Sequence, residues 1–499
     1  MRRIPLLVGT RIWVVSPPDG AVVLHAPPPD AAVADVGAAV RDALRFPLAG
    51  EPLEALVPRG GRVTIVVEPP SLPIPGSPHD PRQLAVDATV SELERMGVPL
   101  ERQTILVATG LARRPGVRDL ETLVPPELAR RFRGAVEVHD AEDDTLVELA
   151  RIDGLLVRAN RALVECDAVV SVTAAETVLH GGPAALVAAT DANTVLRAHA
   201  LSLLEPASAE SWELGVAVER AVARRVPVIG TSLVLNHPRT TGALRGFPYG
   251  EEAVERVAGS PFRRLYSFLP ALVRERVLHT LPVELSVSAA FAGPPSVAHA
   301  EALLRGIELR SVELDAPLDA LCIPIPRTTP YLPRERPNPL LAAFLGLGIA
   351  LRLWRDAFPL VERGTAILLH RFHRHFSHPT QQPYRVFFQG SRTARHPEAL
   401  ADAERSAAAD ERALAEYRAG RACHPLLPFA DWAACRPALE RLGAVLVAGC
   451  RDSAAARELG FVPTHGLGAA LEMVRGRSGP DARIGFLLAP PYFPIRTPA

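Results

Sequence analysis

Residues 104–110 read TILVATG, a short run of aliphatic and β-branched residues that ends in a Thr-Gly pair. A run of this length, bounded by a turn signal, is typical of a buried strand. Residues 81–96 before it and residues 126–132 after it have the apolar spacing of helices. A buried strand between two helices predicts βαβ units and therefore a largely parallel sheet.

The same alternation extends outward from this stretch through the first half of the chain. The strands expected there are Arg62–Val67, Thr104–Ala108, Val136–His139, Ala168–Thr173 and Val226–Ile229. The helices expected between them are Pro81–Met96, Pro126–Phe132 and Ser211–Arg224.

A second series of strands and helices follows. Its expected strands are Glu284–Ala290, Ala320–Ile325, Thr365–His370, Ala444–Ala448 and Arg483–Leu488. Its expected helices are Pro337–Trp354, Ala399–Ala419, Ala454–Leu459 and Leu467–Val474. We therefore predict two α/β domains with largely parallel sheets that face each other across a cleft, residues 1–265 and 266–499, joined by a hinge helix within Pro261–Pro282. Open α/β sheets bind ligands beyond the carboxyl ends of their strands, so Glu68, Thr109 and Thr173 are expected to line the cleft.

Composition narrows the class of protein. The 499 residues include 55 basic and 55 acidic ones, and this balance argues against a nucleic-acid partner. No apolar run reaches the ~18 residues of a membrane helix, and the N-terminal MRRIPLLVGTRIWVV favours a first strand over a signal peptide. Five cysteines without a C-x-x-C pair argue against a disulfide framework or a structural zinc site. We expect a cytoplasmic protein with no membrane partner.

All 55 of these basic residues are arginines, because the chain contains no lysine. A GC-rich genome accounts for this bias without any functional cause. Its chemical consequence is that no side chain can form a Schiff base or a lysine amide, or serve as a P-loop lysine.

Three stretches, in the correct order, resemble the nickel-dependent lactate racemase family. The first joins TILVATGLAR at residues 104–113 to VEVHDAED at residues 136–143. The second runs from ALVECDAVV at residues 162–170 through Glu176 and the His180-Gly-Gly turn to TVLRAH at residues 194–199. The third comprises GAVLVA at residues 443–448, AARELGF at residues 455–461 and LGAALE at residues 467–472.

This resemblance implies an isomerase that racemises or epimerises a small 2-hydroxy acid, with a carboxylate or hydroxy-acid ligand and a nickel-pincer nucleotide as cofactor. It implies catalytic roles for His180 and for Arg113, whose guanidinium would clamp the carboxylate. It also implies that Gly181 and Gly182 approach the cofactor and that His199 is a metal ligand.

Most catalytic positions of that family carry other residues in this chain. Ala112 stands at the first catalytic histidine, Val178 lies near the second, and Ala184 lies near the lysine that tethers the nucleotide. The Asp and Arg of an early proline-rich loop are replaced in the stretch that begins at Glu68, and a Tyr, Gln and Lys are lost after Asn338. We therefore expect that no nucleotide is bound covalently.

Residues 370–378 read HRFHRHFSH and place four histidines within nine residues, just after an expected strand. Neutral imidazole is a common ligand of zinc, nickel and copper, so His370 and His373 are candidate metal ligands together with His199. Arg371 and Arg374, interleaved with the histidines, also suit an anion-binding loop. A polar surface loop is the third interpretation.

Three functions remain open from the sequence. The first is an isomerase of a hydroxy acid with a non-covalent or altered cofactor. The second is a different metal-dependent enzyme that uses His199, His180 and the 370–378 loop. The third is a non-catalytic relative that binds a ligand or a partner. Convergence of His199 with another of these histidines would favour the second function.

Overall fold

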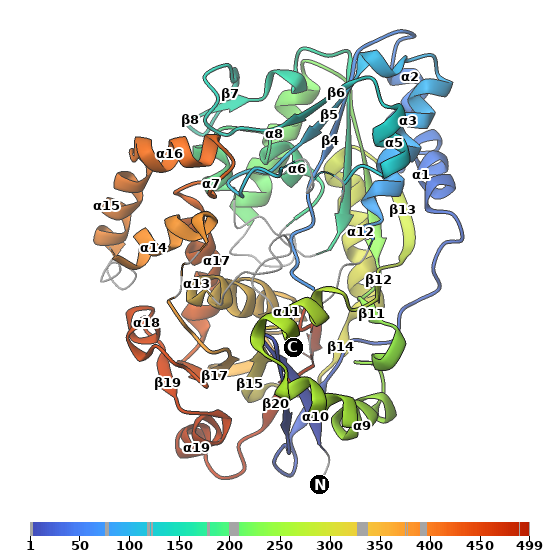
Figure 1. The fold of residues 1–499 in the computed structure, drawn as a ribbon. Coiled ribbons are helices and arrows are strands. Elements are labelled where there is room, and N and C mark those ends of the chain that lie inside the picture. The colour runs from blue at the N-terminus through green and yellow to red at the C-terminus, as the bar shows by residue number, and fades with distance from the viewer. Residues whose placement is uncertain are drawn as a thin grey trace.

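The computed structural model describes residues 3–74, 79–116, 120, 123–176, 180–198, 209–326, 338–374, 376, 378–389, 397–488 and 490–498. Two six-stranded sheets dominate the described part of the chain, and helices pack against both (Figure 1). The predicted α/β class with largely parallel sheets is confirmed.

The first sheet, here called the N-terminal sheet, has the order β13-β10-β9-β4-β5-β6. Its strands are β4 (Val63–Val67), β5 (Gln103–Val107), β6 (Ala135–Val138), β9 (Ala168–Ala175), β10 (Val228–Leu235) and β13 (Val287–Gly293). Only β13 is antiparallel to its neighbour. Every residue of β4 and β9 is buried, and this explains why these strands are continuous apolar runs.

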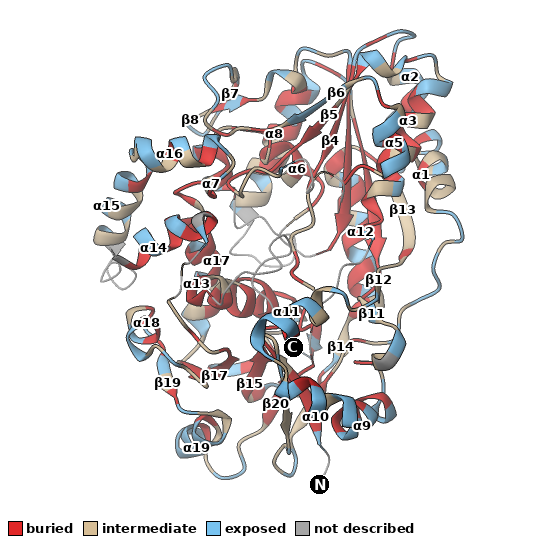
Figure 2. Ribbon diagram, in the orientation of Figure 1, coloured by how far each residue is buried: buried red, intermediate tan, exposed pale blue. Residues whose placement is uncertain are grey.

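The second sheet, the C-terminal sheet, has the order β19-β18-β17-β15-β20-β3, and all its strands are parallel. Its strands are β3 (Val22–Leu24), β15 (Leu318–Pro324), β17 (Leu360–Leu369), β18 (Ala444–Ala448), β19 (Val462–Thr464) and β20 (Ile484–Leu487). Figure 2 shows its central strands buried, with exposed residues on the outer helices.

Smaller strands and the helices complete the described structure. The smaller strands are β1 (Ile4–Val8), β2 (Arg11–Val15), β7 (Val147–Ile152), β8 (Leu155–Ala159), β11 (Arg239–Thr240), β12 (Val283–Glu284), β14 (Val312–Glu313), β16 (Trp354–Asp356) and β21 (Ile495–Thr497). The helices up to residue 279 are α1 (Val36–Arg45), α2 (Leu53–Leu56), α3 (Arg82–Arg95), α5 (Pro126–Arg131), α6 (Pro183–Val187), α7 (Ala192–Arg197), α8 (Ala209–Ala223), α9 (Glu251–Gly259), α10 (Pro261–Phe268) and α11 (Ala271–His279). The later helices are α12 (Pro295–Arg310), α13 (Pro339–Ala343), α14 (Gln382–Gln389), α15 (Pro397–Ala408), α16 (Glu411–Arg418), α17 (Leu427–Arg441), α18 (Ser453–Glu458) and α19 (Leu467–Ser478). None of the helices in the described ranges is long and apolar enough to cross a bilayer.

The strands of the two sheets are not separated by a single boundary at residue 265. Strand β3, near the start of the chain, belongs to the C-terminal sheet, and β13 belongs to the N-terminal sheet. The assignment of Glu284–Ala290 to the second series was therefore wrong, because its apolar pattern reveals a strand but not its partner. The division at residue 265 into two folding units stays a prediction.

Three predicted helices are also broken. The expected hinge helix is two helices, α10 and α11, which are separated at Leu269-Pro270. The expected helix over residues 337–354 ends early, and the chain continues through a π-helical turn into β16. The expected helix over residues 399–419 is divided into α15 and α16 at Asp410, which caps α16.

Candidate functional site

The candidate site lies at the carboxyl edge of the N-terminal sheet. Glu68 follows β4 and Glu176 follows β9, and these strands are parallel neighbours. Thr109 follows β5, which is the other neighbour of β4. Glu68, Thr109 and Thr173 therefore lie at the same edge of the sheet, and their predicted position along a cleft between two domains stays a prediction.

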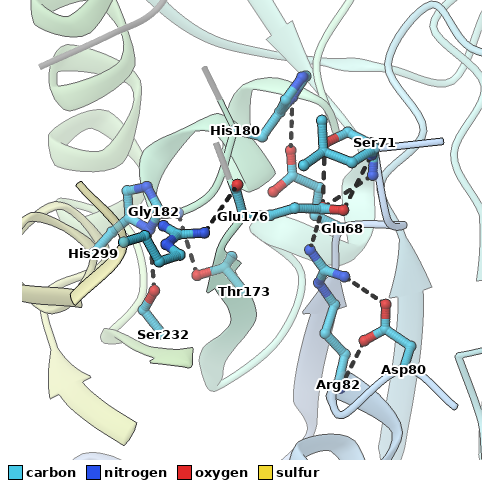
Figure 3. Close-up of polar contacts among 12 residues, drawn as sticks. Glu68, Ser71, Asp80, Arg82, Thr173, Glu176, His180, Gly182, Ser232 and His299 are labelled. Atoms are coloured by element: carbon cyan, nitrogen blue, oxygen red, sulfur yellow. Dashed lines mark hydrogen bonds and ion pairs between the residues drawn. The ribbon is translucent and has the colours of Figure 1, made fainter. Parts of the chain in front are cut away.

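A buried ion network forms one side of this edge. The Arg82 guanidinium, 1% exposed, lies 2.6 Å from Asp80 Oδ2 and 2.8 Å from Glu176 Oε2. Glu176 also accepts hydrogen bonds from the backbone N–H groups of Ser71 and Leu72, each at 3.0 Å (Figure 3). Burial opposes the charge of Glu176, but Arg82 and these hydrogen bonds hold its pKa below the usual value. The network fastens the loop after β4 to the end of β9.

His180 and Glu68 form a separate pair beside this network. His180 Nδ1 lies 3.5 Å from Glu68 Oε1, and the two side chains are 25% and 9% exposed. In Figure 3 His180 lies on the far side of Glu68 from Arg82 and Asp80. Glu68 Oε2 is buried without a hydrogen-bond partner among the described residues. A carboxylate in this position can orient the imidazole.

Gly181 and Gly182 place His180 there for a steric reason. Both have positive φ, at +98° and +56°. A Cβ on Gly181 would lie 2.2 Å from His299 Cε1, and a Cβ on Gly182 would lie 2.5 Å from His299 Cβ. The Gly182 N–H donates to Thr173 Oγ1 at 3.2 Å, so this N–H is already used within the protein. A side chain larger than glycine at either position would collide with His299. The predicted contact of these glycines with a cofactor stays a prediction.

His299 itself is a structural residue beneath the turn. It is 1% exposed, and its Nδ1 lies 3.0 Å from Ser232 Oγ. Burial lowers the pKa of His299 to about 4, although the nearby Glu68 acts in the opposite direction. A neutral imidazole is therefore packed under His180.

Asp431, in the other part of the chain, is within the electrostatic range of His180. It lies in α17, is 2% exposed, and accepts a 2.5 Å hydrogen bond from Tyr384 Oη. Burial raises the pKa of Asp431 to about 7, and the Tyr384 hydrogen bond and the charge of His180 partly offset that rise.

The sequence analysis missed Asp431 and its partner Tyr384. A signal was present, because Asp431 is the only charged residue in PLLPFADWAAC, residues 425–435. A single acid within an apolar helix is a candidate for a perturbed pKa.

Arg113 lies where the two parts of the chain meet. Its Nη1 donates to the Gly420 carbonyl at 3.4 Å, and the adjacent Arg114 pairs with Asp140 at 3.1 Å and donates to the Arg418 carbonyl. Tyr417 strengthens the same contact, because its Oη donates to the Gly110 carbonyl at 3.0 Å. These bonds give Arg113 a bridging position, and its predicted role as a carboxylate clamp stays a prediction.

The described histidines of the 370–378 loop do not form one cluster with His180. His370 is 2% exposed, and burial followed by the charge of Arg371 lowers its pKa to about 3. His373 is half-buried, and His378 Nδ1 lies 2.8 Å from Thr380 Oγ1. His199 and His375 lie outside the described residues. Among the residues that are described, no three His, Cys, Asp or Glu side chains gather in a metal-binding arrangement.

His139 has a structural role. It is fully buried, its Nε2 lies 2.8 Å from the Thr190 carbonyl, and burial lowers its pKa to about 4. It joins the end of β6 to the segment before α7.

A covalently held nucleotide does not suit these residues. Ala184 lies in the first turn of α6, directly after the glycine turn. Neither Ala184 nor any other side chain of this lysine-free chain can form the amide that tethers such a cofactor.

Comparisons with known proteins agree with this architecture. Residues 10–211 match the family model described as the lactate racemase N-terminal domain. The structure resembles that of the lactate racemase apoprotein from Thermoanaerobacterium thermosaccharolyticum, with a TM-score of 0.61, 13% sequence identity and coverage of 99% of each chain. A protein from Thermotoga maritima has a TM-score of 0.48 and 11% identity, over 93% of this chain and 97% of its own. No protein with a curated description matches the sequence. The first structure shares the fold of the whole chain.

Proposed function

We propose that the chain, whose residues 10–211 match the lactate racemase N-terminal domain, is a member of that family and an isomerase that inverts a small 2-hydroxy acid by proton transfer. One observation carries the proposal: the charge of His180, which pairs with Glu68, acts on the pKa of Asp431, which pairs with Tyr384, and the two pairs come from different parts of the chain.

Inversion of a carbon centre by proton transfer needs two acid–base groups on opposite faces of the substrate. One group takes the proton as the C2–H bond breaks, and the electron pair passes into the carboxylate. The other group then gives a proton to the opposite face. An aspartate with a pKa of about 7 can act as acid or base near neutral pH, and histidine is suited to the same work.

The remaining roles follow from position. Glu68 is a positioning residue, because it holds His180 from behind and has a free carboxylate oxygen among the described residues. Arg113 is the proposed clamp for the substrate carboxylate, since guanidinium binds carboxylates in a bidentate manner. The lysine-free chain cannot hold a nickel-pincer nucleotide covalently, and the proton transfer proposed here uses only side chains of the protein.

A second candidate is a non-catalytic relative that binds hydroxy acids. It is favoured by Ala112, which stands where the family resemblance requires a catalytic histidine. The third candidate, a metal-dependent enzyme that uses His199, His180 and the 370–378 loop, stays a prediction, because His199 and His375 lie outside the described residues.

Deuterium exchange distinguishes these candidates. The purified protein is incubated in D2O with single enantiomers of lactate, malate and glycerate, with proton NMR to follow C2 and chiral chromatography to follow inversion. We expect inversion with deuterium incorporated at C2. His180→Gln and Asp431→Asn should each lower the rate about 100-fold or more. Asp481→Asn, on an exposed turn, is the matched control and should not change it.

Two outcomes would contradict proton transfer between these groups. Inversion without deuterium at C2 would show transfer of hydride instead. Saturable binding of a hydroxy acid with neither inversion nor exchange would support the binding protein.

A further inference from the structure

The N-terminal hairpin β1–β2 lies across the carboxyl end of the C-terminal sheet. The Gly9 N–H donates to the Ile325 carbonyl, just past β15, at 2.8 Å. Further along the hairpin, Trp13 packs against Gly449, just past β18, where a Cβ would lie 2.7 Å from Trp13 Cη2. Strand β17 lies between β15 and β18, so the hairpin spans the end of β17 as well.

Four arginines from four segments meet at this place. Arg371 comes directly after His370 at the end of β17, and its carbonyl accepts a 3.4 Å hydrogen bond from the N–H of Arg451, which follows β18. Arg11 begins β2, next to the hairpin turn. Arg274, from α11, reaches the same turn and donates from Nε to Thr10 Oγ1 at 3.4 Å. We call Arg11, Arg274, Arg371 and Arg451 the arginine rim.

The rim carries positive charge that the protein does not neutralise nearby. Within the described ranges, no rim arginine forms an ion pair with a carboxylate. The acids closest in sequence to Arg451 are already used, since Arg374 holds Asp452 at 2.8 Å and Glu458 at 3.1 Å. Partial burial lowers the pKa of Arg371, and the charges of Arg11, Arg451 and Arg274 lower it further.

A buried imidazole lies at the same strand end. His370 is 2% exposed, and its Nδ1 has no hydrogen-bond partner among the described residues. A buried polar atom without a partner is uncommon and points to a group that the protein alone does not supply.

We propose that the arginine rim binds a phosphate group, either as free phosphate or on a phosphorylated small molecule. Guanidinium groups bind phosphate oxygens through paired, charge-assisted hydrogen bonds, and several of them are needed to hold a dianion. The carboxyl end of an open parallel sheet is the usual place for such a site. Arg374 is not part of the proposed phosphate site, because it forms ion pairs with Asp452 and Glu458. Of the two arginines in the 370–378 loop that were predicted to bind an anion, we therefore assign this role to Arg371. The site belongs to the C-terminal sheet and does not depend on the proposed isomerase activity.

Isothermal titration with inorganic phosphate and with glycerol 1-phosphate, at constant ionic strength in chloride, tests the proposal. We expect one saturable site. Arg451→Ser, on an exposed residue, and Arg371→Ser should each weaken binding about tenfold or more, and the double variant should abolish it. Arg475→Ser, on the exposed face of α19, is the matched control and should bind like the unchanged protein. Tighter binding of glycerol 1-phosphate would identify a phosphorylated molecule as the ligand, and equal or weaker binding would identify the free anion.

The proposal is overturned if neither compound binds saturably in chloride, or if the Arg451→Ser variant, folded by circular dichroism, binds phosphate as tightly as the control. Isomerase activity is measured on the same samples. Its presence or absence tests the proposed function separately, because no rim residue belongs to the His180–Asp431 site.

Discussion

Two buried carboxylates, Glu176 and Asp431, have opposite environments although both are almost fully enclosed. Glu176 receives Arg82 and two backbone N–H groups, so its pKa lies below the usual value. Asp431 accepts a hydrogen bond from the Tyr384 hydroxyl, and burial raises its pKa to about 7. A buried carboxylate that an arginine keeps ionised stabilises the fold, whereas one whose pKa lies near 7 is available for proton transfer.

Removal of the Arg82 guanidinium should lower the free energy of unfolding more than the other substitutions below. Arg82→Met leaves Asp80 and Glu176 buried without their partner, so we expect a loss of about 3–5 kcal/mol in the free energy of unfolding. Urea denaturation measures it. The exposed pair of Arg405 and Asp402 provides the control, because Arg405→Met should change stability by no more than about 0.5 kcal/mol. Equal losses in the two variants would contradict a special role for the Arg82 network.

The carboxylate with the raised pKa, Asp431, should give stability the opposite dependence on pH. Because the folded pKa of Asp431 is raised from about 3.9 to about 7, its contribution is fully present below pH 4 and is lost as pH rises through 7. The size is on the order of 4 kcal/mol. The folded pKa of Glu176 is lowered, so its contribution is present above the unfolded pKa and is lost as pH falls through the folded value.

Asp431→Asn removes the contribution of this carboxylate to the pH dependence of stability, because asparagine does not titrate. The variant should gain stability relative to the unchanged protein at pH 8 and should match it more closely at pH 5. Urea denaturation at both pH values measures the difference. A constant difference between pH 5 and pH 8 would show that Asp431 is ionised in the folded protein throughout this range.

Substitution of a glycine in the turn that carries His180 should also destabilise the fold. Gly181→Ala adds a Cβ at positive φ that would lie 2.2 Å from His299, so we expect a loss of about 3 kcal/mol and displacement of His180. Gly468→Ala is the matched control. Its Cβ would meet nothing within 4 Å inside α19, so it should be neutral or should stabilise by about 0.5–1 kcal/mol. Thermal unfolding of both variants measures the contrast, and a neutral Gly181→Ala would remove the steric reason for the glycine.

The smallest expected effect concerns the hydroxyl beside Asp431. Tyr384→Phe removes the 2.5 Å hydrogen bond, so stability should fall by about 1–2 kcal/mol and the pKa of Asp431 should rise further. The pH dependence of stability should then extend to higher pH. A shift to lower pH would mean that the hydroxyl does not stabilise the ionised carboxylate.

The sequence predicted local structure better than the partners of each element. The strand predicted at Ala444–Ala448 has these bounds in the structure, and the prediction of Thr104–Ala108 is displaced by one residue from β5. Strand β13 was assigned to the wrong sheet, because pairing depends on contacts far along the chain. His180 could be named from its glycine turn, but the raised pKa of Asp431 could not be predicted, since the burial of this carboxylate depends on the packing of α17. His370 was interpreted as a possible ligand, and only the structure shows that it is buried.

Carbon-13 NMR titration of the Asp431 carboxyl carbon tests the central claim most directly. The account predicts a pKa of about 7 for Asp431 in the unchanged protein. It also predicts a higher value in His180→Gln, because the nearby imidazolium favours the ionised carboxylate. A pKa near 4, or a value that His180→Gln leaves unchanged, would contradict the claim that these two groups face each other as an acid–base pair.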